Sequence, residues 1–299
     1  MSKLKSSVFS GCASALVTPF LDGAIDFDAL RRNIEFQIES GTDALVICGT
    51  TGEVASLDED EHKKCIEFAV SAVDGRVPLI AGTGSNNTAH ALRMSRFACE
   101  CGADALLIVT PYYNKATPAG LVQHYLTIAD STDKPIILYN VPSRTGLDLP
   151  LSVCKDLSCH ERIVALKDAS GNIARAKEML CEFGEKLDIY CGNDDLTVPM
   201  LSVGASGVIS VASNIIPREM SDICRLWREG RINESMSLEA KFVPLLKALS
   251  CEVNPIPIKT AMDIMGICRA EFRLPLCEAE EKNRALIYNA LNKFNLHRE

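Results

Sequence analysis

Eight short apolar runs, rich in β-branched residues and regularly spaced, constrain the fold of this chain more than any other feature. They cover residues 13–18, 44–48, 78–82, 105–109, 135–139, 163–167, 187–191 and 207–211, and an amphipathic stretch follows each one. The ends of successive runs lie 18 to 32 residues apart. Because this is about the length of one strand–helix–strand unit, the spacing predicts a parallel sheet with helices between its strands.

The character of these runs favours a closed sheet. They are continuously apolar and do not alternate with polar residues, which indicates strands covered on both faces. The segment that begins Gly82-Thr83-Gly84 has Asn87 where a dinucleotide-binding fingerprint needs its third glycine, so we interpret it as a turn. Eight units without a dinucleotide site predict an α/β fold, a (β/α)8 TIM barrel over residues 1–224.

Beyond residue 225 the strand signals stop, and three stretches have helical periodicity: 234–249, 256–267 and 278–294. No low-complexity linker separates them from the barrel. We therefore expect a small C-terminal helical domain over residues 225–299 that packs directly on the barrel.

Charge and cysteine content narrow the class of protein. The formal net charge of −8 disfavours nucleic acid and anionic membrane surfaces as partners. The thirteen cysteines form no C-x-x-C motif, so we interpret residues such as Cys48, the pair Cys99 and Cys101, and the pair Cys154 and Cys159 as small core side chains in a reducing cytosol. No signal-peptide or membrane-spanning apolar stretch is evident, which predicts a cytoplasmic protein.

Two polar residues end neighbouring strands at the edge where such barrels build their active sites. Lys167 closes an apolar run, and burial there favours the neutral amine that attacks a carbonyl. Tyr139 ends the preceding run, which places it at a similar height and within reach for proton transfer. The alternatives are a lysine that extends to solvent or pairs with Asp168, and a tyrosine that only satisfies its hydroxyl.

Two further segments suit carboxylate binding. Arg144, on the loop after Tyr139, has the planar fork that binds a carboxylate bidentately, although a lone loop arginine is often solvated. Residues 49–53 (Gly-Thr-Thr-Gly-Glu) form a tight turn with two hydroxyls and exposed N–H groups, as in anion-binding nests. Asp194 and Asp195 have no histidine nearby in the sequence, so we interpret them as helix N-caps and expect no metal.

Four ordered blocks together resemble the dihydrodipicolinate synthase and N-acetylneuraminate lyase superfamily of class I aldolases, and its dihydrodipicolinate synthase branch most closely. The blocks are residues 49–53, 111–114 (Pro-Tyr-Tyr-Asn), 139–146 (Tyr-Asn-Val-Pro-Ser-Arg-Thr-Gly) and 166–172 (Leu-Lys-Asp-Ala-Ser-Gly-Asn). The resemblance runs over nearly the whole chain. It implies condensation of pyruvate with L-aspartate-4-semialdehyde to 4-hydroxy-tetrahydrodipicolinate, a step of diaminopimelate and lysine biosynthesis.

The resemblance also implies roles for individual residues. Lys167 would form an imine with pyruvate, and Tyr139 would act with Thr50 and Tyr113 as a proton relay. Thr50 and Thr51 would hold the pyruvate carboxylate. In the family the tyrosine at position 113 reaches a neighbouring subunit, so the resemblance implies a homotetramer built as a dimer of dimers.

Three more positions match the substrate pocket of the family. Arg144 would gather the carboxylate of the semialdehyde, and Gly192 and Ile209 would line the pocket beside the lysine. No cofactor is implied, because the protonated imine itself withdraws the electrons that acidify the pyruvate methyl group.

The lysine-inhibited members of this family bind lysine at the tight dimer interface, and the chain matches their pocket only in part. Tyr112, Asn86 and His62 match. Glu59 stands where those members have a first histidine, and His90 stands where they have the glutamate that holds the ammonium group. A carboxylate is thereby lost and a positively charged His90 would repel the effector, so we expect weak lysine inhibition or none.

Two alternative functions stay open at this stage. A sibling aldolase acting on sialic acid or a keto-deoxy sugar acid would use the same imine chemistry, although Arg144 and the paired threonines favour the synthase. A catalytically silent barrel used for binding would be expected to lack the lysine, the tyrosine or the relay threonine, and none of these is missing.

Overall fold

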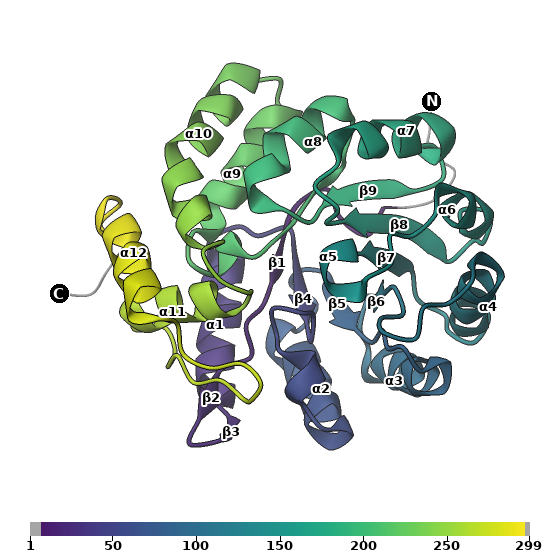
Figure 1. Cartoon of the computed structure of the whole chain (residues 1–299), viewed down its shortest axis with the longest axis horizontal. Coiled ribbons are helices and arrows are strands. Elements are labelled where there is room, and N and C mark those ends of the chain that lie inside the picture. Colours follow the sequence, from purple (N-terminus) through teal and green to yellow (C-terminus); the bar gives the residue numbers. More distant parts are fainter. Residues whose placement is uncertain (1–6, 297–299) are drawn as a thin grey trace.

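The computed structural model of the chain describes residues 7–296 and contains a closed barrel of eight parallel strands. The order around the barrel is β1-β10-β9-β8-β7-β6-β5-β4, and β4 pairs with β1 to close it (Figure 1). The strands are β1 (Gly11–Ala15), β4 (Ala44–Ile47), β5 (Leu79–Gly82), β6 (Ala105–Val109), β7 (Ile136–Asn140), β8 (Ile163–Asp168), β9 (Asp188–Cys191) and β10 (Gly207–Ser210). Each overlaps one of the eight apolar runs, so the predicted (β/α)8 barrel is confirmed.

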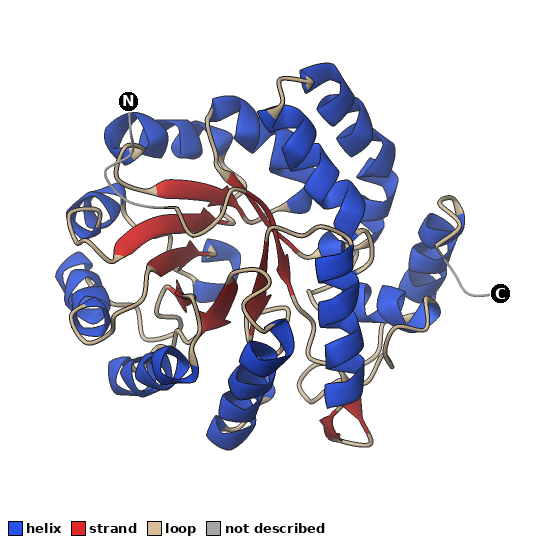
Figure 2. Ribbon diagram, turned by 180° about the vertical axis from the view of Figure 1, so that it is seen from behind, coloured by secondary structure: helices blue, strands red, loops and turns tan. Residues whose placement is uncertain are grey.

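Helices surround the barrel on its outer side (Figure 2). They are α1 (Phe27–Glu39), α2 (Glu59–Val73), α3 (Thr88–Cys101), α4 (Pro118–Ala129), α6 (Leu151–Leu157), α7 (Ile173–Phe183), α8 (Thr197–Val203) and α9 (Pro217–Arg228). Between strand ends and these helices lie α5 (Pro142–Thr145) and the 3-10 turns η1 (Val54–Ser56), η2 (Asp194–Leu196) and η3 (Ala212–Asn214). These short segments form the rim at the carboxyl ends of the strands.

A small hairpin outside the barrel was not predicted. Its strands are β2 (Phe20–Leu21) and β3 (Ala24–Ile25), which pair antiparallel. Two residues per strand are too few to establish an alternating pattern in the sequence, so this hairpin cannot be predicted from apolar periodicity.

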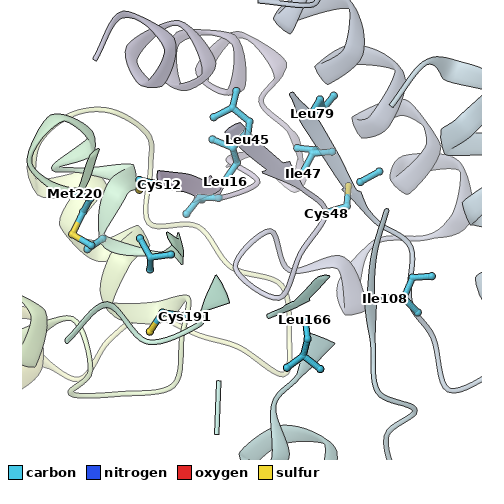
Figure 3. Packing of buried hydrophobic residues seen from close by; sticks show 14 of the residues in the cluster. Cys12, Leu16, Leu45, Ile47, Cys48, Leu79, Ile108, Leu166, Cys191 and Met220 are labelled. Carbon is cyan, nitrogen blue, oxygen red and sulfur yellow. The ribbon is translucent and has the colours of Figure 1, made fainter. Parts of the chain in front are cut away.

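Buried side chains form two layers. In β4, Leu45 and Ile47 point outward to the helices, whereas Ala44 and Val46 point to the barrel axis. Figure 3 shows part of the outer layer, with Leu45, Ile47 and Leu166 among its members. The strands are therefore apolar on both faces because one face packs on helices and the other fills the barrel.

The same alternation sets the direction of the two candidate catalytic side chains. Leu138 and Leu166 belong to the outer layer, so the residues that follow them, Tyr139 and Lys167, point inward. These two residues lie directly opposite each other in the register of β7 and β8. The strand pairing thus brings phenol and amine to one height at the barrel mouth.

Three further helices follow the barrel and gather on one flank of it (Figure 1). They are α10 (Ile232–Ala248), α11 (Ile256–Ile264) and α12 (Glu281–Asn292), close to the predicted helical stretches. Helix α10 packs on α8 and α9, and α11 reaches η3 at the barrel mouth. The predicted boundary between residues 224 and 225 falls inside α9, because the last barrel helix continues to Arg228.

All thirteen cysteines are free. Cys48 and Cys154 are buried as expected, and Cys99 and Cys101 are half-buried. The expectation of a core position was wrong for Cys159, which is exposed because it follows the C-cap of α6, where the chain turns at the surface. Across residues 7–296, none of the helices combines the length and the apolar character needed to cross a membrane.

Candidate active site

Lys167 and Tyr139 lie together inside the barrel mouth. Their side chains are 5% and 6% exposed, and Lys167 Nζ lies 4.5 Å from the centroid of the Tyr139 ring. Lys167 therefore does not extend to solvent. Asp168 faces the other side of β8, where its carboxylate accepts hydrogen bonds from Asn140 Nδ2 at 2.8 Å and Ser170 Oγ at 2.7 Å. The interpretation of Lys167 as a partner of Asp168 is thus wrong for this geometry.

A cavity of about 240 Å³ opens at Lys167. Its lining includes five residues predicted for the site: Thr51, Tyr139, Arg144, Lys167 and Gly192. A volume of this size suits a small molecule, and the lining combines one amine, one phenol, one threonine hydroxyl and one guanidinium. This set of groups can bind a carboxylate and carry out chemistry at an adjacent carbonyl.

Gly192 and Ile209 hold different positions relative to this cavity. A Cβ atom at Gly192 would come within 2.6 Å of the Cβ of Ala169, so glycine is needed for the end of β9 to pack beside the segment that follows Lys167. Ile209 is fully buried in the barrel interior with Tyr139, and it is not among the residues that line the cavity.

The turn of residues 49–53 follows β4 and presents its two threonines to different cavities. Thr51 lines the cavity of Lys167, whereas Thr50 lines a neighbouring cavity of about 370 Å³. The two cavities share Val141, Arg144 and Asn254. The carboxylate nest suggested by the sequence therefore stays a prediction, with its two threonines at neighbouring cavities.

Arg144 lies on α5, where its side chain is exposed at the mouth of both cavities. Its Nη2 donates to the backbone oxygen of Asn254 at 2.8 Å, and Asn254 Nδ2 donates to Thr51 Oγ1 at 3.1 Å. Asn254 thus contacts both predicted carboxylate-binding residues. It was not predicted, because it lies in a loop between C-terminal helices where no pattern in the sequence identifies a partner.

The two aspartates after β9 do not act as the N-caps that we expected. Asn193 occupies the N-cap position of η2. Asp194 is half-buried and accepts from the backbone N–H groups of Val211 at 3.1 Å and Ala212 at 2.8 Å, so it supports the start of η3 instead. Burial raises the pKa of Asp194. Within the described residues, no group of three or more His, Cys, Asp or Glu side chains is arranged to hold a metal ion.

Comparison with known proteins adds an independent observation. A sequence model of the Dihydrodipicolinate synthetase family matches residues 8–294. The chain belongs to this family. A curated relative named 4-hydroxy-tetrahydrodipicolinate synthase, from Clostridium novyi (strain NT), is 46% identical over 289 residues, which are 97% of this chain and 98% of the relative.

Solved structures of family members share the fold. The chloride-inhibited dihydrodipicolinate synthase from Acinetobacter baumannii, in complex with pyruvate, is 40% identical with a TM-score of 0.94, covering 96% of this chain and 99% of that one. The enzyme from Cyanidioschyzon merolae with lysine bound is 34% identical with a TM-score of 0.94, covering 97% and 100%. The resemblance seen in the four sequence blocks is therefore confirmed at the level of the family.

One residue that the resemblance assigns to the proton relay lies apart from the site in the single chain. Tyr113 is 90% exposed and adopts a positive φ of 72°. It lines neither the cavity of Lys167 nor that of Thr50. Within the single chain, Tyr113 is therefore not part of the lining around Lys167.

Most residues of the partly matched effector pocket gather around the larger cavity. They are Glu59, His62, His90 and Tyr112. Asn86 is not in this lining, and its backbone oxygen accepts from Asn114 Nδ2 at 2.9 Å. His62 Nε2 donates to the Gly82 carbonyl at 2.8 Å, and burial lowers the pKa of His62 to about 4, so its imidazole is neutral at pH 7.

The carboxylate of Glu59 already has three partners within its own chain. Lys63 Nζ lies 2.8 Å away, Arg93 Nη2 lies 3.3 Å away, and His90 Nδ1 lies 3.4 Å away. The hydrogen bonds from Lys63 and Arg93 lower the pKa of Glu59 to about 2. Glu59 is therefore ionised at neutral pH but engaged within its own chain.

Proposed function

We propose that this chain condenses pyruvate with L-aspartate-4-semialdehyde to 4-hydroxy-tetrahydrodipicolinate, through an imine on Lys167. The observation that carries the proposal is the buried amine opposite Tyr139 in a small cavity that also holds Thr51 and Arg144. The names of its relatives support the same reaction, and the Acinetobacter baumannii relative has been solved with pyruvate.

The first half of the reaction takes place at Lys167. Its amine nitrogen attacks the C2 carbonyl of pyruvate, and Tyr139 supplies the proton with which the oxygen leaves as water. The resulting protonated imine withdraws electrons from C3, so a methyl proton is lost and an enamine forms. The substrate-derived imine performs this function itself, and the proposed reaction uses no cofactor.

Binding of the pyruvate carboxylate is assigned to Thr50 and Thr51. Because Asn254 Nδ2 donates to Thr51 Oγ1, the hydroxyl proton of Thr51 remains available for a carboxylate oxygen. Thr50 is assigned to the proton relay together with Tyr113 of a neighbouring subunit, which implies a homo-oligomer, in our proposal a tetramer.

The second half joins the two substrates. The enamine carbon attacks the aldehyde carbon of the semialdehyde, whose carboxylate lies at the cavity mouth with Arg144. One N–H of this guanidinium is used by the Asn254 carbonyl, and the others remain for a carboxylate. The amino group of the semialdehyde then attacks the imine carbon, which closes the ring and frees Lys167.

Parallel assays of pyruvate consumption separate this reaction from those of the sibling aldolases. Aspartate semialdehyde, N-acetylmannosamine and a sugar aldehyde are each supplied with pyruvate at equal concentration. We expect turnover with the semialdehyde to exceed the other two. Faster turnover with either sugar substrate would assign the chain to a sibling activity, and no turnover with any of them would contradict the enzyme proposal.

Replacing Arg144 by alanine is expected to weaken use of the semialdehyde much more than binding of pyruvate. Loss of a charge-assisted bidentate contact should lower kcat/KM for the semialdehyde by roughly 10- to 100-fold. The measurement compares that loss with borohydride trapping of pyruvate, and Arg225→Ala, an exposed arginine on α9, serves as the control. An equal loss in both measurements would mean that Arg144 binds pyruvate or stabilises the fold.

Lysine is expected to inhibit weakly or not at all. The position that would need a carboxylate for the ammonium carries His90, and the nearby Glu59 is occupied by Lys63 and Arg93. A lysine titration at neutral pH measures this, with His90→Glu as the matched variant, which should tighten inhibition by roughly 10-fold or more. Half-inhibition of the unmodified chain at submillimolar lysine would contradict this expectation.

A further inference from the structure

A buried ion pair lies behind the threonine turn, and the reaction above does not use it. Lys259 on α11 and Glu53 are 0% exposed, and their Nζ and Oε1 atoms are 2.6 Å apart. Lys259 Nζ also lies 4.1 Å from the centroid of the Phe20 ring. In the described part of the chain, Glu53 Oε2 has no hydrogen-bond partner, and the ion pair of this buried carboxylate is made by Lys259.

The position of Glu53 makes this pair relevant to the site. Glu53 closes the turn that carries Thr50 and Thr51, and its N–H donates to the Thr50 carbonyl at 3.1 Å. Its φ of 52° lies in the left-handed region, which is uncommon for a residue with a side chain and is stabilised where buried contacts hold the residue in place. The side chain of Glu53 provides such a hold, because it is anchored to α11 through Lys259.

The same C-terminal segment contacts the turn a second time. Asn254, five positions before Lys259, donates to Thr51 Oγ1 at 3.1 Å. The loop before α11 therefore contacts the turn at Thr51, and α11 itself anchors the turn at Glu53. Burial lowers the pKa of Lys259, and the nearby carboxylate of Glu53 opposes that shift.

We propose that Lys259 is a positioning residue, whose ion pair with Glu53 holds the Thr50–Thr51 turn in the shape that receives the pyruvate carboxylate. This inference rests on the proposed function and assigns a role in substrate binding to a helix outside the barrel. The C-terminal helices then act on the affinity for the first substrate as well as on the stability of the fold.

The decisive variant is the double replacement Glu53→Gln with Lys259→Met. It removes the ionic link without leaving one charge buried and unpaired, so loss of stability is limited. The pyruvate concentration that half-saturates borohydride trapping of the chain should rise roughly 10-fold or more. The KM for the semialdehyde should change less than about threefold, because Arg144 lies outside the turn.

Two further variants distinguish a specific effect on the Thr50–Thr51 turn from general destabilisation of the C-terminal helices. Ile287→Ala opens a buried site in α12 and destabilises the same C-terminal helices away from the turn, and it should leave half-saturating pyruvate within about twofold of the unmodified chain. Glu53→Gln alone keeps an acceptor for Lys259, so it should raise the half-saturating pyruvate concentration less than the double variant does. If the double variant does not fold, this single variant provides the test of the proposal.

The proposal is overturned if half-saturating pyruvate stays within about twofold of the unmodified chain in these Glu53 variants, or if Ile287→Ala raises it equally. Failure of the unmodified chain to trap pyruvate at all would instead contradict the proposed function. The two failures are therefore distinguishable in one experiment.

Discussion

Replacing Lys167 by alanine is expected to lower kcat/KM for condensation by at least about 10³-fold and to abolish imine formation. The amine is the atom that bonds to pyruvate in the proposed reaction, and removal of a covalent nucleophile has effects of this size or larger. Among residues 7–296, no other lysine lines its cavity, so none is placed to substitute for it.

The test of this variant compares steady-state rates and borohydride trapping with those of Lys177→Ala. Lys177 is an exposed lysine on α7, the helix that follows the strand of Lys167, and its loss should leave both measurements unchanged. Turnover of the Lys167 variant near that of the control would contradict the imine mechanism.

Replacing Tyr139 by phenylalanine is expected to lower the rate of imine formation by roughly 10²- to 10⁴-fold, the usual effect of a general acid–base group. The phenyl ring keeps its packing beside Lys167 Nζ, and only the hydroxyl is lost. Single-turnover trapping measures the rate, and thermal unfolding should show a nearly unchanged midpoint. A rate of imine formation within threefold of that of the unmodified chain would mean that Tyr139 only packs beside Lys167.

Tyr139→Phe chains also test which subunit supplies Tyr113 to the proton relay. Because Tyr113 is 90% exposed in the single chain, the proposal assigns it to the site of a neighbouring subunit. Mixing Tyr113→Phe chains with Tyr139→Phe chains should restore part of the activity, since some mixed dimers contain one complete site. Absence of rescue, with subunit exchange confirmed, would place the relay within one chain.

The barrel and the pairing of its two central residues were predictable because both depend on local patterns. Apolar runs mark the strands, and their spacing marks the helices between them. Lys167 and Tyr139 each end a run, so parallel pairing places them together, and the register of β7 and β8 matches this expectation. Periodicity along the chain is sufficient for inferences of this kind.

Contacts between distant segments were not predictable in the same way. Asp194 supports η3, and Asn254 joins Thr51 to Arg144; nothing in the residues around either one identifies its partner. Lys259 did carry a signal, as the one charged residue among the first seven of α11, all of which are buried. A charge in such a segment indicates a buried counterion, but the sequence does not say that it is Glu53.

In the proposed reaction, Lys167 is the residue to which pyruvate becomes attached. Borohydride added to the unmodified chain with pyruvate, followed by digestion and mass spectrometry, locates that attachment. We expect a reduced adduct on Lys167, dependent on pyruvate and absent from Lys167→Ala. An adduct located on another lysine, or no adduct while condensation proceeds, would contradict it.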